Sequence, residues 1–314
     1  MKTLLTTLYT IALLCGAAAA NEFPTRTIEV LTHAGPGGGT DVTARMMMLR
    51  ARLELKTDMV VVNKRGWGGG VAMDHFLDQV ADGHTILVFT SGHAASMAHG
   101  RSKLTLEDIR PIARGTDDPQ ILMVRCGSYA DAGAFVDAQR QYGLTYGTTH
   151  LGNIDDVSAH MFTKKGGLAA PEVQPYSGGG QLAEQLVAGS VDVAVLNLAE
   201  AGAEIATGAI CPIVVLADRR LAALPEVTTA KELGIDVSFS TVRGFVVHRE
   251  TPDAVAKQIE AALLNAMNHV VYQAFLTSVG LDASSVAGAE EWGAQIGTIT
   301  AEMDAALREL GFTE

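Results

Sequence analysis

The sequence predicts an α/β protein that is folded into two lobes. Short apolar runs rich in β-branched residues alternate with helical patterns along almost the whole chain of 314 residues. Alternation of this kind builds α/β layers around mostly parallel sheets. A single sheet holding all the predicted strands would be unusually large, so two lobes accommodate them more economically.

The composition indicates a chain that can build a sizeable core. Hydrophobic residues make up 48% and charged residues 18% of the sequence, which excludes a disordered protein. The formal net charge is −12 and the sequence has no basic run. This charge distribution gives no electrostatic footprint for nucleic acid, so we exclude nucleic acid as a partner.

Residues 1–20 are predicted to form a cleavable secretory signal peptide. Lys2 supplies a positive start, residues 4–14 are apolar, and residues 18–20 are small alanines suited to cleavage. The apolar stretch is shorter than the ~20 residues that a membrane anchor needs. A lipid anchor on Cys15 is disfavoured, because bulky Leu14 stands where small residues are expected. We therefore expect the mature chain to be exported.

Export places Cys126 and Cys211 in an oxidising compartment, where two cysteines can form a disulfide. Both cysteines adjoin short apolar runs that are predicted to be strands. Two buried free thiols are equally compatible with these positions, and the sequence leaves both alternatives open.

The strands are predicted from apolar runs at residues 27–31, 59–63, 85–89, 121–125, 144–146, 172–175, 191–196, 212–216 and 242–247. Helices fill the intervals between them. In the first helix Val42, Met46 and Leu49 recur at helical spacing and form one apolar stripe. The last helices are predicted over residues 252–280 and 289–311.

The order of these elements predicts two crossings between the lobes. A fresh series of strands begins after residues 118–119, and the chain returns near residues 240–243. We expect residues 21–120 and 243–314 in the first lobe, including the last helices, and residues 121–242 in the second. The cleft between the lobes is the expected ligand site, because open α/β sheets bind ligands beyond the carboxyl ends of their strands.

Three glycine triplets, at residues 37–39, 68–70 and 178–180, each follow a predicted strand and precede a predicted helix. Free backbone N–H groups and the positive end of the helix dipole meet an anion there, and glycine lets the anion approach. A single triplet is otherwise an ordinary turn. We predict anion binding at the first triplet, because Thr40 or Asp41 can cap its helix, and a packing turn at the second.

A similar turn, residues 147–153, precedes a helix predicted to start at Asp155. Its threonines, histidine and asparagine add hydroxyl, imidazole and amide groups to the backbone donors. Two anion cradles on opposite lobes suit a ligand with a carboxylate at each end.

The sequence lacks the common catalytic motifs. No nucleotide-binding Gly-Lys-Ser or Gly-Lys-Thr follows the glycines, and neither Gly-x-Ser-x-Gly nor His-Glu-x-x-His occurs. The histidines are scattered, so we predict no metal and no cofactor. We predict that the protein is not an enzyme. The rival hypothesis, a secreted enzyme acting on an anion, has only Asp41, His93 and His150 as acid–base candidates, and His93 is equally an ordinary loop histidine.

Six motifs occur in order over nearly the whole mature chain, at residues 36–41 (PGGGTD), 62–66 (VNKRG), 81–87 (ADGHTIL), 175–180 (PYSGGG), 186–193 (LVAGSVDV) and 224–234 (LPEVTTAKELG). Taken together they resemble the Bug-type extracytoplasmic solute receptors of tripartite tricarboxylate transporters. The set is specific to the family, whereas no single motif is.

The resemblance implies a two-lobed periplasmic binding protein, type II-like and of the Venus-flytrap kind, with two crossover segments. Such a receptor closes on a small carboxylate, either a di- or tricarboxylate or an aromatic acid. It delivers this ligand to the membrane permease of the transporter, and we expect it to be monomeric. The alternative partner is a membrane sensor that recognises the same closed surface.

The resemblance also implies a set of ligand-binding residues from both lobes. One carboxylate is expected between the loop of residues 37–41 and the loop of residues 148–153, and the other positions border the cleft. The expected set is Gly37, Gly38, Gly39, Thr40, Asp41, Ser91, His93, Thr148, Thr149, His150, Asn153, Tyr176 and Asn197.

Two arginines depart from the family pattern. Arg65 stands where proline is usual, and Arg243 lies near the second crossover, where an aromatic residue is common nearby. Arg243 either meets a ligand carboxylate through two hydrogen bonds or pairs with an acidic neighbour. In the first case the ligand differs from the usual small dicarboxylates and an aromatic acid becomes a candidate.

Overall fold

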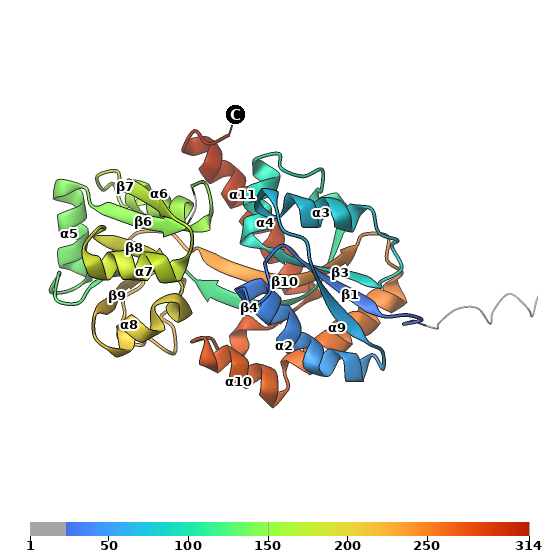
Figure 1. The fold of residues 1–314 in the computed structure, drawn as a ribbon. Helices are drawn as coiled ribbons and strands as arrows, with labels where there is room; N and C mark the ends of the chain where they lie inside the picture. The colour runs from blue at the N-terminus through green and yellow to red at the C-terminus, as the bar shows by residue number, and fades with distance from the viewer. Residues whose placement is uncertain (1–22, 150, 314) are drawn as a thin grey trace, which may run out of the picture.

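The structure is a computed structural model that describes residues 23–149 and 151–313. Two β-sheets, each flanked by helices, form two lobes that are joined side by side (Figure 1). The predicted two-lobed α/β fold is therefore confirmed. The predicted signal peptide and His150 lie outside the described residues.

The first lobe is built on a six-stranded sheet with the order β11-β4-β10-β3-β1-β2. Its strands are β1 (Ile28–Thr32), β2 (Met59–Asn63), β3 (Thr85–Thr90), β4 (Ile109–Pro119), β10 (Ser240–His248) and β11 (Ala287–Gly288). Its helices are α2 (Gly39–Glu54), α3 (Gly70–Leu77), α4 (Ser91–Ala98), α9 (Asp253–Met267), α10 (Val270–Ser278) and α11 (Ala289–Glu309).

The second lobe is built on a five-stranded sheet with the order β7-β6-β8-β5-β9. Its strands are β5 (Ile121–Arg125), β6 (Thr145–Thr149), β7 (Glu172–Tyr176), β8 (Val193–Leu196) and β9 (Ile210–Val215). Its helices are α5 (Ala132–Tyr142), α6 (Ile154–Lys165), α7 (Gly179–Ala188) and α8 (Gly202–Ala206).

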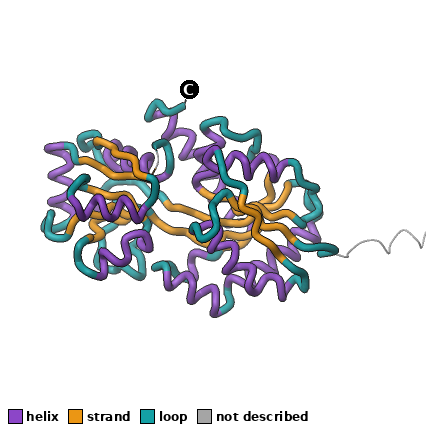
Figure 2. Tube along the Cα trace, viewed as in Figure 1, coloured by secondary structure: helices purple, strands orange, loops and turns teal. Residues whose placement is uncertain are grey.

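Both sheets are mixed rather than mostly parallel. In the first sheet β10 runs antiparallel to β3 and β4, and in the second β5 runs antiparallel to β8 and β9. The parallel pairs are those of the βα units, such as β1 with β3 and β6 with β7. The antiparallel pairs involve the strands next to the crossings, because there the chain enters and leaves each lobe. In the view shared by Figures 1 and 2, β4 and β10 run between the two lobes.

Strand β4 was not predicted from the sequence. Its eleven residues include Arg110, Pro111, Arg114, Asp117 and Asp118, which break any apolar run. The strand forms nonetheless, because it pairs with β10 along nearly its whole length. Arg114 is buried within this strand, and its charge is compensated by hydrogen bonds. Its guanidinium group donates to the Ser284 and Ser285 carbonyl oxygens at 2.8 and 2.9 Å.

The two crossings are hydrogen-bonded to each other. Gln120 joins β4 to β5, and its backbone N–H donates to the Phe239 oxygen at 2.8 Å, while its side-chain amide donates to Thr241 Oγ1 at 2.8 Å. Strand β10 enters the first sheet already at Ser240, opposite Pro119, whereas the predicted boundary lies between residues 242 and 243. The paired crossings form the connection about which the lobes can move.

Helix α11 packs differently from the prediction, which placed residues 289–311 wholly on the first lobe. Trp292 and Ile296 lie in an apolar cluster of the first lobe, but Met303 and Leu307 lie in the main cluster of the second. The physical reason is length, because 21 residues extend a helix by about 31 Å and carry its apolar stripe beyond one lobe. In Figure 1 this dark red helix lies between the two lobes.

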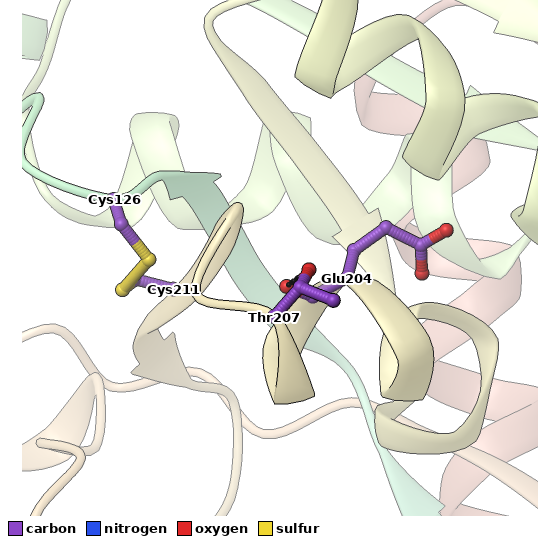
Figure 3. Close-up of a disulfide and its surroundings, with 4 residues drawn as sticks. All are labelled: Cys126, Glu204, Thr207 and Cys211. Carbon is purple, nitrogen blue, oxygen red and sulfur yellow. Dashed lines mark hydrogen bonds between the residues drawn. A yellow bond between two sulfur atoms is a disulfide. The ribbon is translucent and has the colours of Figure 1, made fainter.

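A disulfide joins Cys126 to Cys211, with their Cα atoms 4.9 Å apart (Figure 3). Cys126 follows β5 and Cys211 belongs to the neighbouring strand β9, where Val124 is its backbone partner. The structure therefore resolves the alternative that the sequence left open. The bond lies at the end of β5 that is remote from the crossing at Gln120.

Within the described residues no helix is long and apolar enough to cross a membrane.

Candidate ligand-binding cleft

Two cavities between the lobes are lined in part by residues of the predicted site. The Arg243 cavity has a volume of about 280 Å³, and the arginine-pair cavity has a volume of about 550 Å³. The Arg243 cavity is lined by Gly39, Val42, Thr43, Thr116, Asp118, Asn197, Ala199, Glu200, Arg243, Phe275, Val279 and Leu281. The arginine-pair cavity is lined by His33, Arg65, Gly66, Gly68, Gly69, Gly92, Ala95, Ser96, Arg101, Leu151, Gly152 and Asn153.

The loop between β1 and α2 is held by Asp41 from within. The Asp41 carboxylate accepts hydrogen bonds from the Gly37 N–H, the Arg45 guanidinium and the Asn63 amide at 2.8–2.9 Å. The Arg45 hydrogen bonds above all lower the pKa of Asp41 to about 2. Asp41 is therefore occupied in fixing the glycine loop, and neither ligand binding nor acid–base chemistry fits its side chain in this structure.

Helix α2 begins without a side-chain cap. Gly38 is the N-cap residue, and no side chain accepts a hydrogen bond from the first-turn N–H groups. These amides carry the positive end of the helix dipole. Of the predicted anion loop, residues 37–41, the Gly37 and Gly38 N–H groups donate within the loop, to Asp41 Oδ2 at 2.9 Å and to the Gly35 oxygen at 3.0 Å, and only Gly39 lines the Arg243 cavity.

The guanidinium group of Arg243 lies against this helix start. A Cβ atom placed on Gly39 would be 3.0 Å from Arg243 Nη2. Arg243 Nη1 donates a long hydrogen bond to Thr116 Oγ1 at 3.4 Å, and it lies 3.8 Å from Asp118 Oδ2. Among the described residues the buried Arg243 Nε has no partner. Arg243 therefore reaches the cleft with donor capacity that the protein leaves unused.

Two carboxyl groups near Arg243 have raised pKa values. Burial raises the pKa of Asp118 to about 7, with the charges of Glu200 and Asp117 adding to the effect and that of Arg243 opposing it. Burial also raises the pKa of Glu200. Protonation of Asp118 near neutral pH weakens its attraction to Arg243, from which it already lies 3.8 Å away.

We predict that carboxylate affinity falls by about 10-fold between pH 6 and pH 8. Asp118 is protonated below its pKa of about 7, and its deprotonation then adds a negative charge that competes with the ligand for Arg243. Calorimetry across this range measures the slope. Asp118→Asn should flatten it and keep the affinity of pH 6, and an unchanged slope in Asp118→Asn would contradict the assignment.

Ser91 and His93 have structural roles rather than exposed side chains. Both side chains are fully buried. Ser91 Oγ donates to the Ser240 carbonyl oxygen at 2.7 Å and accepts from the Val242 N–H at 3.0 Å, and His93 Nδ1 accepts from the Thr90 N–H at 3.1 Å. In this structure both residues fix the start of α4, and their role as ligand-binding residues stays a prediction.

The loop after β6 is partly occupied by its own carboxylates. The Thr149 N–H donates to Asp155 Oδ2 at 3.0 Å, its hydroxyl donates to the same oxygen, and the Gly152 N–H donates to Asp156 Oδ2 at 2.7 Å. Burial raises the pKa of Asp155 to about 7. Thr148 is fully buried. Asn153, the N-cap residue of α6, lines the arginine-pair cavity and makes no capping hydrogen bond.

The third glycine triplet holds a side chain of the protein itself. A Cβ atom on Gly179 would clash with the Glu200 carboxyl group, which therefore packs directly against this helix start. Glu200 Oε2 accepts from the Asn197 N–H at 2.9 Å. The spacing Asn197-x-x-Glu200 is that of a capping box, and this signal could have predicted the position of Glu200 from the sequence.

Tyr176 and Asn197 lie on the second lobe as expected. The Asn197 amide donates to the backbone oxygens of Asp118 and Pro119 at 2.9 and 3.1 Å, which ties it to the first crossing. Asn197 lines the Arg243 cavity. Tyr176 is half-buried and its hydroxyl donates to Gln174 at 3.2 Å.

No group of three metal-ligating side chains occurs among residues 23–149 and 151–313.

Comparison with known proteins places this architecture in a family. Residues 43–293 match the tripartite tricarboxylate transporter family receptor, TctC. A UPF0065 protein of Bordetella pertussis is 30% identical over 290 residues, which cover 89% of this chain and 88% of the relative. The chain belongs to the tripartite tricarboxylate transporter receptor family.

Two solved structures show how far the likeness to this receptor extends. A TctC solute binding protein from Polaromonas, solved without ligand, has a TM-score of 0.83 and 26% identity, over 91% of this chain and 99% of that one. MatC from Rhodopseudomonas palustris, solved with bound malate, has a TM-score of 0.74 and 23% identity, over 91% and 100% of the two chains. The second likeness concerns the fold alone.

The family resemblance drawn from the sequence motifs is thus confirmed. Arg243 and Arg65, which depart from the motif pattern, each line one of the two cavities of this receptor. Arg101, also in the lining of the arginine-pair cavity, was missed by sequence reasoning, because an isolated arginine after a helix carries no local signal for a ligand.

Proposed function

We propose that this receptor binds a small carboxylate in the cleft and delivers it from the periplasm to the permease of a tripartite tricarboxylate transporter. The observation that carries the proposal is the Arg243 guanidinium at the uncapped start of α2. A carboxylate at this position would meet a cation and backbone N–H groups together. The malate bound to MatC supports a carboxylate as the ligand class.

The proposed contacts are strong enough for tight binding. Micromolar affinity corresponds to ~8 kcal/mol. A hydrogen bond to a charged group contributes about 1.5–3 kcal/mol, and a favourable helix start contributes up to about 2 kcal/mol. Two hydrogen bonds from Arg243 and two or three amides of α2 therefore exceed this value before the entropy cost of binding is subtracted.

Both lobes take part in the proposed site. Gly39, Thr116 and Arg243 line the cavity from the first lobe, whereas Asn197 and Glu200 line it from the second. A ligand held by both sides stabilises the closed arrangement, because it makes all its contacts only when the lobes meet. The permease then distinguishes the loaded receptor by its closed shape.

The binding test is a thermal-shift screen of the mature chain against di- and tricarboxylates, amino acids and aromatic acids, followed by calorimetry. Malate is the first probe. Ligands should raise the melting temperature with concentration. If no carboxylate binds but another class of solute does, the proposed ligand class is wrong.

We predict that Gly39→Val weakens carboxylate binding by at least about 10-fold. The new side chain would meet the flexible end of Arg243 at 3.0 Å and push the guanidinium away from the helix start, while the helix itself tolerates the change. Gly38 is a poorer test, because its Cβ would meet the Gly35 oxygen at 3.2 Å within its own loop.

The matched control is Gly180→Val, which also places a branched side chain in the first turn of a helix. A Cβ on Gly180 meets nothing within 4 Å, and this residue lines neither cavity. Calorimetry should show an unchanged affinity for the control. Equal affinities for both variants would refute the position of the ligand at Gly39.

A further inference from the structure

The arginine-pair cavity contains two guanidinium groups and, among the described residues, no carboxylate. Arg65 and Arg101 line it, and no described aspartate or glutamate does. Across residues 23–149 and 151–313, neither arginine makes an ion pair or a side-chain hydrogen bond with another residue that the structure describes. The chain has a net charge of −12. Two positive charges without a described acidic partner at one cavity therefore indicate a site that favours an anionic ligand.

Glycine backbone forms the wall behind each guanidinium. A Cβ on Gly35 would lie 3.5 Å from Arg65 Nε, and a Cβ on Gly68 would lie 2.9 Å from Arg101 Nη1. Gly68 also has a φ of +64°, which L side chains rarely adopt. The second triplet was predicted to be a packing turn, and the structure shows that it brings Arg101 close to bare backbone.

Two histidines behind this wall have unused ring nitrogens. Burial, with the charge of Arg243 as a second cause, lowers the pKa of His33 to about 4, and burial lowers the pKa of His93. Both rings are therefore neutral at pH 7. The Thr90 N–H donates to His93 Nδ1, so the His93 proton resides on Nε2.

His33 lines the cavity, whereas His93 lies behind the lining residue Gly69. His93 Nε2 would be 2.7 Å from a Cβ on Gly69. Among the described residues, His93 Nε2 and His33 Nδ1 are buried and have no hydrogen-bond partner. Buried polar groups without partners are costly and rare, so they point to a polar ligand in this position.

We propose that the arginine-pair cavity is a second anion subsite, in which Arg65 and Arg101 hold a second carboxylate of the same ligand. This inference rests on the proposed function, in which the first carboxylate binds at Arg243. The two cavities border one segment, since His33 lines the arginine-pair cavity and Gly39 lines the Arg243 cavity. The ligand class is then a dicarboxylate or tricarboxylate that is long enough to reach from Arg243 to the arginine pair.

The subsite would also complete closure of the lobes. Arg65 and Arg101 come from the first lobe, whereas Gly152 and Asn153 on the opposite wall come from the second. A carboxylate between them would be held by planar guanidinium donors on one side and by the Asn153 amide group on the other, since the Gly152 N–H already donates to Asp156. A monocarboxylate leaves this subsite empty and should therefore bind more weakly.

The test compares acids that differ only in the second carboxylate. Calorimetry on the mature chain uses succinate against butyrate and adipate against hexanoate. In the wild-type protein the dicarboxylate of the better-fitting pair should bind at least about 10-fold more tightly. In the double variant Arg65→Gln/Arg101→Gln the dicarboxylate should weaken by about 10- to 100-fold, while the monocarboxylate keeps its affinity.

The matched control is Arg52→Gln, which removes one exposed positive charge in the last turn of α2. It should leave all affinities unchanged, which separates direct contact from the long-range effect of net charge. Equal binding of mono- and dicarboxylates, or selectivity that survives in the double variant, overturns the second subsite but leaves the proposed function standing. Failure of every acid to bind would refute both.

Discussion

Arg243→Gln is expected to weaken carboxylate binding by about 100-fold, which corresponds to ~3 kcal/mol. Among the described residues, the substitution removes the only positive charge in the lining of the Arg243 cavity. It also removes the paired donors that a planar guanidinium offers to a carboxylate. The helix start at Gly39 remains, so weak binding by backbone amides should persist.

The fold should tolerate this substitution. Arg243 has only a long hydrogen bond to Thr116 and a 3.8 Å approach to Asp118 within the described part of the chain, and Asp118 can lose its charge because its pKa is already about 7. The melting temperature without ligand should therefore change little. Arg243→Lys keeps the charge but not the planar donor pair, and an intermediate affinity is expected.

Calorimetry with the best carboxylate from the screen measures these affinities. Wild-type affinity in Arg243→Gln would show that Arg243 merely pairs with Asp118, which is the alternative left open by the sequence. In that case the ligand would have to lie elsewhere in the cleft.

Removal of the disulfide in Cys126→Ala/Cys211→Ala is expected to destabilise the protein by about 2–4 kcal/mol. The two cysteines are separated by 85 residues, and the bond restricts this long loop in the unfolded chain. The melting temperature should fall by about 10 °C, given the usual scaling for domains of this size.

Reducing agent provides the internal control for this prediction. It should lower the melting temperature of the wild-type protein toward that of the double variant, while the variant itself should not respond. Carboxylate affinity should be unaffected, because the disulfide lies at the end of β5 that is remote from the crossing. A variant as stable as the oxidised wild-type protein would contradict the stabilising role.

The repeated βα units and the glycine loops could be predicted from the sequence because their signals are local. An apolar run such as residues 85–89 is buried as a strand wherever it lies in a sheet, and β3 is indeed fully buried. A glycine triplet between a strand and a helix likewise indicates that another group closely approaches the backbone there. The structure shows what approaches each triplet: Arg243 at Gly39, Arg101 at Gly68 and Glu200 at Gly179.

Other features could not be predicted because they depend on distant partners. Strand β4 is stable only through its pairing with β10, which lies more than a hundred residues later in the chain. The roles of Asp41 and Ser91 depend on which groups surround them after folding. Asp41 meets Asn63 and Ser91 meets Ser240, and these contacts turn expected ligand residues into supports of the cleft.

The anchoring of α11 in both lobes constrains how the receptor opens. Two crossing strands alone would permit the lobes to bend and also to twist against each other. A helix embedded at Trp292 in one half and at Leu307 in the other adds a third connection between them. Any change in the relative orientation of the halves must therefore bend this helix or draw one of its ends out of its apolar cluster.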